Sequence, residues 1–235
     1  MMYIRSSEDR GTANFGWLHS RHSFSFGHYY DPRHMGISAL RVINDDEVAP
    51  GAGFDTHGHR DMEIISYILE GAIEHKDSMG NQFIVPAGEV QRMSAGTGIT
   101  HSEFNHSSDK PLKFLQIWIQ PNQTGIQPSY EQKAIAQSGK LTPLVTPDGR
   151  DGSLSLHQNA EMHRLVLNTA EQIQLLPQLG CGYLHIIEGK LTLDSAGESI
   201  QLTNGDAVGI QNQSLDITAE SSVTALWFDL PGLRY

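Results

Sequence analysis

Apolar and polar positions alternate along most of the chain in short runs, and turn-forming residues interrupt these runs at frequent intervals. A period of two is typical of β-strands, because successive residues of a strand point to opposite faces. The clearest run covers residues 112–120, where Leu112, Phe114, Gln116 and Trp118 share one face and Leu115, Ile117 and Ile119 share the other. Further strands are predicted at residues 38–44, 62–69, 72–76, 82–85, 90–94, 183–187, 190–193, 199–202, 207–210 and 223–230. The only helical pattern covers residues 169–175.

The two halves of this pattern are similar to each other. Residues 67–71 (Tyr-Ile-Leu-Glu-Gly) precede a strand and a turn, and residues 185–189 (His-Ile-Ile-Glu-Gly) do the same. Residues 121–152, between them, are rich in Pro, Gly, Gln and Thr, which is typical of a linker, here with room for a strand of its own. Many short strands at regular spacing favour a sandwich or barrel. We therefore predict an all-β fold of two jelly-roll-like barrels, with domains at residues 1–134 and 135–235.

Composition narrows the range of partners. The formal net charge of -11 argues against non-specific binding to nucleic acid and against anchoring on anionic lipid. A single cysteine, Cys181, rules out an intrachain disulfide framework. No apolar segment has the length needed to span a bilayer, and residues 1–10 lack the apolar core of a signal peptide. We expect a cytoplasmic protein with neither a nucleic acid nor a membrane as partner.

Histidine is unusually frequent in this composition, with 12 residues, nine of which precede residue 110. His57 and His59 stand one residue apart, so on a strand their imidazoles point to one face. His101 and Glu103 have the same spacing. Three imidazoles and one carboxylate that converge inside a barrel would hold a divalent metal ion. Nitrogen and oxygen donors of this kind suit iron, manganese, cobalt, nickel, copper or zinc.

The remaining ionisable residues have simpler interpretations. An isolated histidine is more often a hydrogen-bonded structural residue than a ligand, and we assign that role to His19, His22, His28 and His34, although they could line the mouth of a pocket. Solvated edge positions without a functional role are expected for His75, His106 and Glu70. Ligand spacing is missing in the second half, at His157, His163 and His185. The second barrel is therefore predicted to lack metal ligands.

Two motifs connect the histidine cluster to a known superfamily. The first cupin motif is matched, with its last glycine one residue late, by Gly51, His57, His59, Glu63 and Gly71. In the second cupin motif Gln91 stands where a histidine is expected. A second alignment of this motif starts at Gly88 and reaches His101 with two extra residues, which preserves the face of a strand.

With these motifs in place, the chain resembles the pirin family, whose members contain two cupin barrels. The resemblance covers most of the chain and is carried by residues 9–11 (Asp-Arg-Gly), 16–18 (Gly-Trp-Leu), 22–26 (His-Ser-Phe-Ser-Phe), 30–32 (Tyr-Asp-Pro), 57–59, 94–103, 130–132 and 148–153. It implies a single divalent metal ion, with iron placed first, held by His57, His59, His101 and Glu103. Glu63, a ligand in ordinary cupins, is the alternative carboxylate.

The resemblance also implies an activity. Bacterial relatives of this family are quercetin 2,3-dioxygenases, and the mammalian protein is a transcriptional coregulator. We therefore expect a dioxygenase that opens an aromatic flavonol such as quercetin with dioxygen, in which Glu103 also acts as the base that removes the substrate proton. One alternative is a metal-binding regulatory protein that contacts a protein partner. The other is a cupin isomerase or a barrel without catalysis.

The predicted site has a measurable stoichiometry. Protein purified without chelators should carry about one metal ion per chain, because only the first half contains a ligand cluster. Elemental analysis by mass spectrometry measures this ratio directly. Protein that contains no metal, and takes up neither iron nor copper afterwards, would contradict the predicted site.

Overall fold

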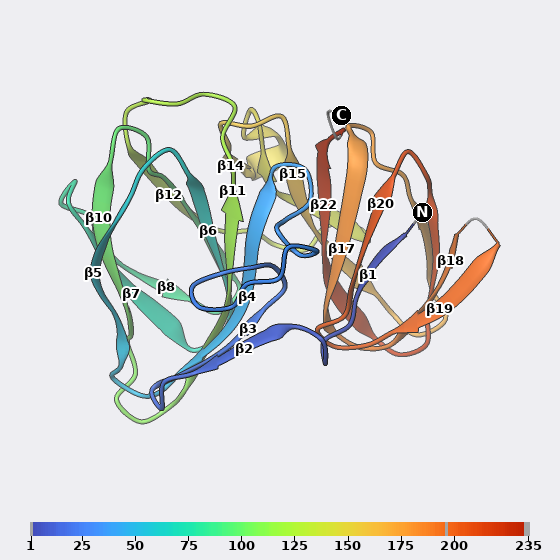
Figure 1. The fold of residues 1–235 in the computed structure, drawn as a ribbon, viewed down its shortest axis with the longest axis horizontal. Helices are drawn as coiled ribbons and strands as arrows, with labels where there is room; N and C mark the ends of the chain where they lie inside the picture. Colours follow the sequence, from blue (N-terminus) through green and yellow to red (C-terminus); the bar gives the residue numbers. More distant parts are fainter. Residues whose placement is uncertain (1, 196, 233–235) are drawn as a thin grey trace.

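The computed structural model describes residues 2–195 and 197–232, and almost every regular element in it is a strand. One short 3-10 helix, η1 (Arg150–Gly152), is the exception among these residues, and none of their helices is long and apolar enough to cross a membrane. The strands form two barrels that lie side by side (Figure 1). Each barrel combines a seven-stranded sheet with a four-stranded sheet. The predicted all-β architecture is confirmed.

The first barrel lies on the left in Figure 1. Its larger sheet has the strand order β12-β9-β6-β11-β4-β3-β2, and its smaller sheet has the order β5-β10-β7-β8. The strands are β2 (Gly11–Asn14), β3 (Leu18–His22), β4 (Leu40–Val48), β5 (Gly53–His59), β6 (Glu63–Glu70), β7 (Ala72–Asp77), β8 (Gln82–Pro86), β9 (Glu89–Ser94), β10 (Ile99–Asn105), β11 (Leu112–Ile119) and β12 (Ser129–Ala134).

The second barrel repeats this arrangement. Its sheets have the orders β1-β20-β17-β22-β15-β13-β14 and β16-β21-β18-β19. The strands are β1 (Tyr3–Arg5), β13 (Leu141–Thr146), β14 (Leu154–Ser155), β15 (Glu161–Leu167), β16 (Gln172–Leu175), β17 (Gly180–Glu188), β18 (Leu191–Ser195), β19 (Glu198–Leu202), β20 (Ala207–Gln211), β21 (Leu215–Ala219) and β22 (Val223–Pro231). The first strand of the chain, β1, thus pairs with β20 in the sheet of the second barrel.

The internal repeat predicted from sequence corresponds to equivalent strands. Strands β6 and β17 occupy matching positions in the two large sheets, between β9 and β11 in one and between β20 and β22 in the other. Each is followed by a glycine with positive φ, 79° at Gly71 and 102° at Gly189. A Cβ atom at Gly189 would lie 2.2 Å from the Ser222 carbonyl oxygen. Glycine is therefore required there both by the backbone angle and by the close approach of another strand.

The helix predicted at residues 169–175 is wrong, because β16 occupies this segment and pairs with β21. Ile173 and Leu175 pack with the interior of the second barrel, while Gln172 and Gln174 are exposed. Four residues that alternate in this way fit a strand, and so short a run does not separate the two periods. Residues 121–152 contain β12 and β13, so the expected linker includes strands.

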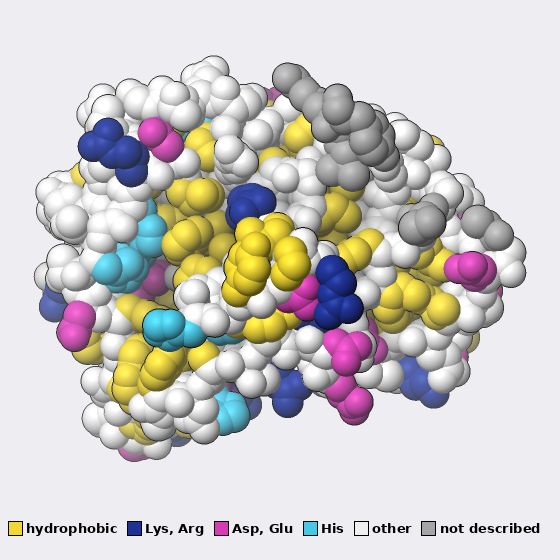
Figure 2. Space-filling model, viewed as in Figure 1, with side chains coloured by type: hydrophobic (Ala, Val, Ile, Leu, Met, Phe, Trp, Pro, Cys, Tyr) yellow, Lys and Arg dark blue, Asp and Glu magenta, His cyan; other side chains and the backbone are white. Residues whose placement is uncertain are grey.

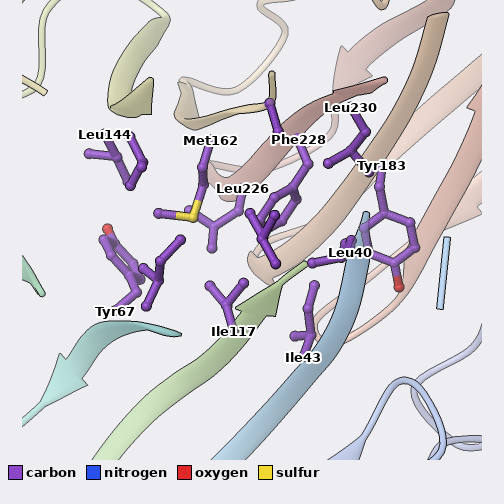
Figure 3. Close-up of a cluster of buried hydrophobic side chains, with 14 of the residues drawn as sticks. Leu40, Ile43, Tyr67, Ile117, Leu144, Met162, Tyr183, Leu226, Phe228 and Leu230 are labelled. Atoms are coloured by element: carbon purple, nitrogen blue, oxygen red, sulfur yellow. The ribbon is translucent and has the colours of Figure 1, made fainter. Parts of the chain in front are cut away.

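The alternation of residues 112–120 has the predicted effect on β11. Phe114 and Trp118 belong to clusters inside the first barrel, whereas Leu115, Ile117 and Ile119 point outward. The outward residues join a buried cluster between the large sheets of the two barrels (Figure 3). Side chains of both barrels meet there, among them Leu40, Ile43, Ile117, Met162, Leu226 and Phe228. Burial of this apolar surface holds the barrels together.

The interiors of the two barrels differ in polarity. Along β6 the inward residues are Ile64, Ser66 and Ile68, so a polar position lies between two apolar ones. The second barrel is filled by one apolar cluster, to which β16 and β21 contribute Leu175, Leu215 and Ile217. Because β16 and β21 are the equivalents of β5 and β10, apolar side chains stand where the first barrel carries its histidine pairs.

Buried His185 gives the fold a pH dependence that does not involve the ligand cluster. It lies on β17, and its Nδ1 atom has no hydrogen-bond partner among the described residues. Burial, aided by the positive charge of Arg10, lowers the pKa of His185 to about 3. The folded chain therefore keeps this ring neutral at pH values where the unfolded chain protonates it.

The free energy of unfolding should consequently fall as the pH decreases from about 6.5 toward 3. Replacement of His185→Leu removes this contribution, which reduces the slope by up to about 1.4 kcal/mol per pH unit. Urea titrations across this pH range measure the slope. His19→Leu, at an exposed position of β3, is the matched control for the loss of an imidazole. An unchanged slope in His185→Leu would contradict the assignment.

Candidate metal centre

The predicted cluster of histidines forms on two neighbouring strands. Strand β5 carries His57 and His59, and β10 carries His101, which pairs directly with His57. The Nε2 atom of His101 lies 3.0 Å from Nε2 of His59 and 3.1 Å from Nε2 of His57. The three rings therefore lie close together, with their Nε2 atoms directed toward one another.

The orientation of the rings suits a bound ion. Nδ1 of His57 donates a hydrogen bond to the backbone oxygen of Asp55 at 2.7 Å, which leaves the lone pair on Nε2. Nitrogen ligands bind transition metals at about 2.1 Å, so two of them at right angles around one ion lie about 3.0 Å apart. The observed separations of the Nε2 atoms match this value. These donors fit one divalent metal ion.

Two of the rings, His59 and His101, are also kept neutral, as metal ligation requires. Burial, together with the neighbouring imidazoles of His101 and His57, lowers the pKa of His59 to about 4. Burial is also the main reason why the pKa of His101 is lowered, against the opposing charge of Glu103. Lone pairs are therefore available at neutral pH without prior loss of a proton.

Glu103 lies on the same strand as His101 and lines the same cavity as His57 and His59. Its carboxylate is oriented by two hydrogen bonds, from Ser66 Oγ to Oε1 at 3.1 Å and from Gln116 Nε2 to Oε2 at 2.8 Å. The donor atoms of Glu103, His101 and His75 lie within 4.8 Å of one another. A second group of donor atoms within this distance is formed by His57, His59 and His101, and it does not include Glu103. His101 thus belongs to both groups of donor atoms.

The expectation that His75 is a solvated edge residue is wrong. Its side chain is completely buried, and Nε2 lies 3.1 Å from a carboxylate oxygen of Asp77. Strand β7 pairs with β10 and turns this side chain inward, where its ring centroid lies 5.4 Å from that of His101. The expectation holds for His106 and Glu70, which are exposed and pair with Glu74 and Lys113, respectively.

Glu63, the alternative ligand, is buried at a different place. It accepts a hydrogen bond from Ser94 Oγ at 2.8 Å and lies 3.4 Å from Nδ1 of His157. Both groups of donor atoms in the first barrel exclude it. Glu63 therefore contacts the second half of the chain, while the three histidines converge on the cavity.

A row of polar side chains supports the cluster, and sequence reasoning missed it. The row crosses five strands, because the register pairs His22 with Asn44, Asn44 with Gln116, Gln116 with Ser66 and Ser66 with Gln91. Members are hydrogen-bonded across strands; His22 Nδ1, for example, donates to Asn44 Oδ1 at 2.8 Å. The available signal was the presence of polar residues at inward positions of otherwise apolar strands. Gln91, at the position of the usual cupin histidine, lies 3.5 Å from His75.

Beside the histidines a cavity of about 510 Å³ opens inside the first barrel. Aromatic rings line it: Trp118 packs edge-on 5.1 Å from His59, and Phe54 packs 5.2 Å from Trp17. His22 and His28 also line it, as the pocket interpretation of the N-terminal histidines suggested. On the side of the first barrel, Figure 2 shows histidine side chains next to hydrophobic ones at the surface. The cavity suits a planar aromatic ligand.

Known proteins share both the sequence and the fold. The family model described as Pirin matches residues 4–119, and the model described as Quercetinase C-terminal cupin domain matches residues 143–230. A protein of Escherichia coli O157:H7 named quercetin 2,3-dioxygenase is 49% identical over 233 residues, which cover 98% of this chain and 99% of that protein.

Two solved structures are also similar to this chain. The crystal structure of YhhW from Escherichia coli superimposes with a TM-score of 0.94 at 46% identity and covers 100% of both chains. The structure of bacterial pirin YhhW in complex with nickel(II) has a TM-score of 0.93 at 47% identity, over 99% of this chain and 100% of the other. The bicupin fold expected from the sequence is thus confirmed, and two matching family models, close sequence relatives and superimposable structures place this chain in the pirin family.

Proposed function

We propose that the protein is a metal-dependent quercetin 2,3-dioxygenase, which opens the ring of a flavonol with dioxygen. The observation that carries this proposal is the convergence of three imidazoles on a cavity lined by aromatic rings. The names of the close bacterial relatives support the same activity. The alternative of a regulatory protein without catalysis is not favoured, because a purely regulatory metal would not require a cavity of this size.

We assign the metal to His57, His59, His101 and Glu103. A divalent transition metal bound there supplies Lewis acidity toward the substrate hydroxyl and a centre at which dioxygen reacts. Glu103 accepts the proton of that hydroxyl, and Ser66 and Gln116 hold its carboxylate in place. Iron is the proposed metal, with copper, zinc, manganese, cobalt and nickel as alternatives, and the structure of bacterial pirin YhhW in complex with nickel(II) supports a divalent ion.

We also propose that the two halves of the chain have different roles. Residues 1–134 would form the metal-binding unit, and residues 135–235 would form the unit without metal ligands. Every residue that lines the cavity belongs to the first range. Strand β1 is an exception to a simple division, since it pairs with β20 of the second barrel.

The activity is tested with metal-loaded protein and quercetin in air-saturated buffer. An oxygen electrode and the absorbance of the flavonol should report consumption of equal amounts of dioxygen and quercetin. His101→Gln should lose turnover together with most of its metal, whereas His19→Gln, at an exposed position, should retain both. Turnover by metal-loaded protein that does not exceed that of metal-free protein would refute the proposed function.

The identity of the carboxylate ligand is tested by two matched substitutions. Glu103→Gln keeps the size of the side chain but removes the charge that compensates the metal, so metal affinity should fall about tenfold or more. Turnover at equal metal loading should fall further, because the base is lost as well. Glu63→Gln should retain the metal, because Glu63 bonds Ser94 instead of facing the histidines.

Competition titrations with a chelator measure the metal affinity of both variants. Loss of metal from Glu63→Gln, combined with full occupancy and turnover in Glu103→Gln, would exclude Glu103 as a ligand. The ordinary cupin set of His57, His59 and Glu63 with one further histidine would then replace the assignment.

A further inference from the structure

One buried carboxyl group in the cavity has no part in the proposed metal centre. Asp46 lies on β4, is 3% exposed, and lines the same cavity as His57, His59 and Glu103. Its Oδ1 atom has no hydrogen-bond partner among the described residues. Leaving a buried oxygen unpaired costs about 1–3 kcal/mol, so such atoms are expected to meet a ligand or water.

The register places Asp46 away from the histidines along the cavity. It pairs with Phe114 on β11 and with Ser20 on β3. Phe114 lies four residues before Trp118, the ring that packs against His59. A strand rises about 3.4 Å per residue, so the levels of Asp46 and Trp118 differ by roughly 14 Å. Asp46 therefore lies toward the end of the cavity where Phe54 packs against Phe114.

This separation fits an elongated planar ligand better than a small one. A flavonol contains a fused pair of rings joined to a third ring, and its hydroxyl groups are distributed over both parts. If the oxygen on the fused rings reaches the histidines, the remaining rings extend along the cavity between Trp118 and Phe54. The only buried carboxyl group at that end, among the described cavity-lining residues, is Asp46.

The chemical state of Asp46 suits a hydrogen bond with a neutral phenol. Burial raises its pKa to about 7, with contributions from the negative charges of Asp45 and Glu103 and against the hydrogen bond of Ser20. Near neutral pH the carboxyl group is therefore protonated in a large part of the molecules. It then donates as well as accepts a hydrogen bond, and it does not place a second full charge beside Glu103.

We propose that Asp46 is a substrate-binding residue that selects polyhydroxylated flavonols by hydrogen-bonding a phenolic hydroxyl on the rings that extend away from the three histidines. This inference rests on the proposed function, since it assumes that a flavonol occupies the cavity. It adds a specificity determinant to that function. A site that hydrogen-bonds a substrate hydroxyl discriminates against an analogue that lacks this group, because the protein atom is then left unpaired.

The test compares quercetin with 3-hydroxyflavone, which keeps the hydroxyl that reaches the metal but lacks the distant ones. Dissociation constants of both are measured without oxygen on the metal-loaded protein, by isothermal titration calorimetry. Wild-type protein should bind quercetin more tightly. Asp46→Leu should weaken quercetin binding roughly tenfold and change 3-hydroxyflavone binding by less than about twofold. Asp46→Asn, which keeps a donor and an acceptor, should retain quercetin affinity within about threefold.

Two controls guard against indirect effects. Glu47→Leu removes the adjacent carboxylate of β4, which is exposed on the other face of the strand, and should leave both affinities unchanged. Metal content and the urea midpoint of each variant report whether the barrel is intact. Should Asp46→Leu fail to fold, Asp46→Asn and Asp46→Ser provide the same comparison, with Asp46→Ser expected to lose quercetin affinity because its hydroxyl is too short to reach the ligand.

The outcomes separate this inference from the proposed function. Equal losses for both flavonols, or no loss for either, would exclude Asp46 as the contact while leaving wild-type turnover of quercetin unaffected. A selective loss in a protein that binds quercetin but does not consume oxygen would support Asp46 as the contact and refute the dioxygenase activity. Wild-type protein that binds neither flavonol would overturn both.

Discussion

The cost of removing polar side chains from water is the constraint on which the arrangement of the first barrel depends. A buried polar group is tolerated where its partners are provided by the protein, and the first barrel provides many of them in one layer, which on β6 lies between the apolar Ile64 and Ile68. Across this layer, Ser66 and Gln116 hold Glu103, and Asn44 holds His22. The strand register brings these partners opposite one another. The same pairings that satisfy the barrel therefore also fix the direction of the ligands.

The second barrel has the same strand topology but an interior filled by apolar side chains. Equivalent strands carry Leu175, Leu215 and Ile217, and their interior is a continuous apolar cluster. Apolar packing of this kind stabilises a barrel without specific hydrogen bonds. Its large sheet also covers the outer face of β11 and β6, where Ile117 and Tyr67 are buried (Figure 3). The second barrel thus provides a rigid support for the strands on which the polar layer is built.

Much of this organisation could be predicted from the sequence, because strands and paired ligands both obey a period of two. The alternation in β11 and the spacing of His57, His59 and His101 required no tertiary information. The polar layer could not be predicted without tertiary information, because His22, Ser66 and Gln91 become neighbours only through the register of five strands. His75 was misjudged for the same reason: its environment is provided by β10, which is distant in sequence. The short segment 172–175 was misread because four residues carry too little periodicity.

The pairing of β1 with β20 affects how the sheet of the second barrel forms and how far its edge is exposed to aggregation. Strand β1 belongs to a sheet whose other strands all lie between residues 141 and 231, so this part of the sheet forms only when distant segments of the chain come together. A chain cut between the barrels would leave β20 with unpaired backbone groups along one side, and such edges recruit strands from other molecules. Strand β1, which is three residues long, therefore replaces the exposed edge of β20 with a shorter one, and its pairing links the two barrels into one structural unit.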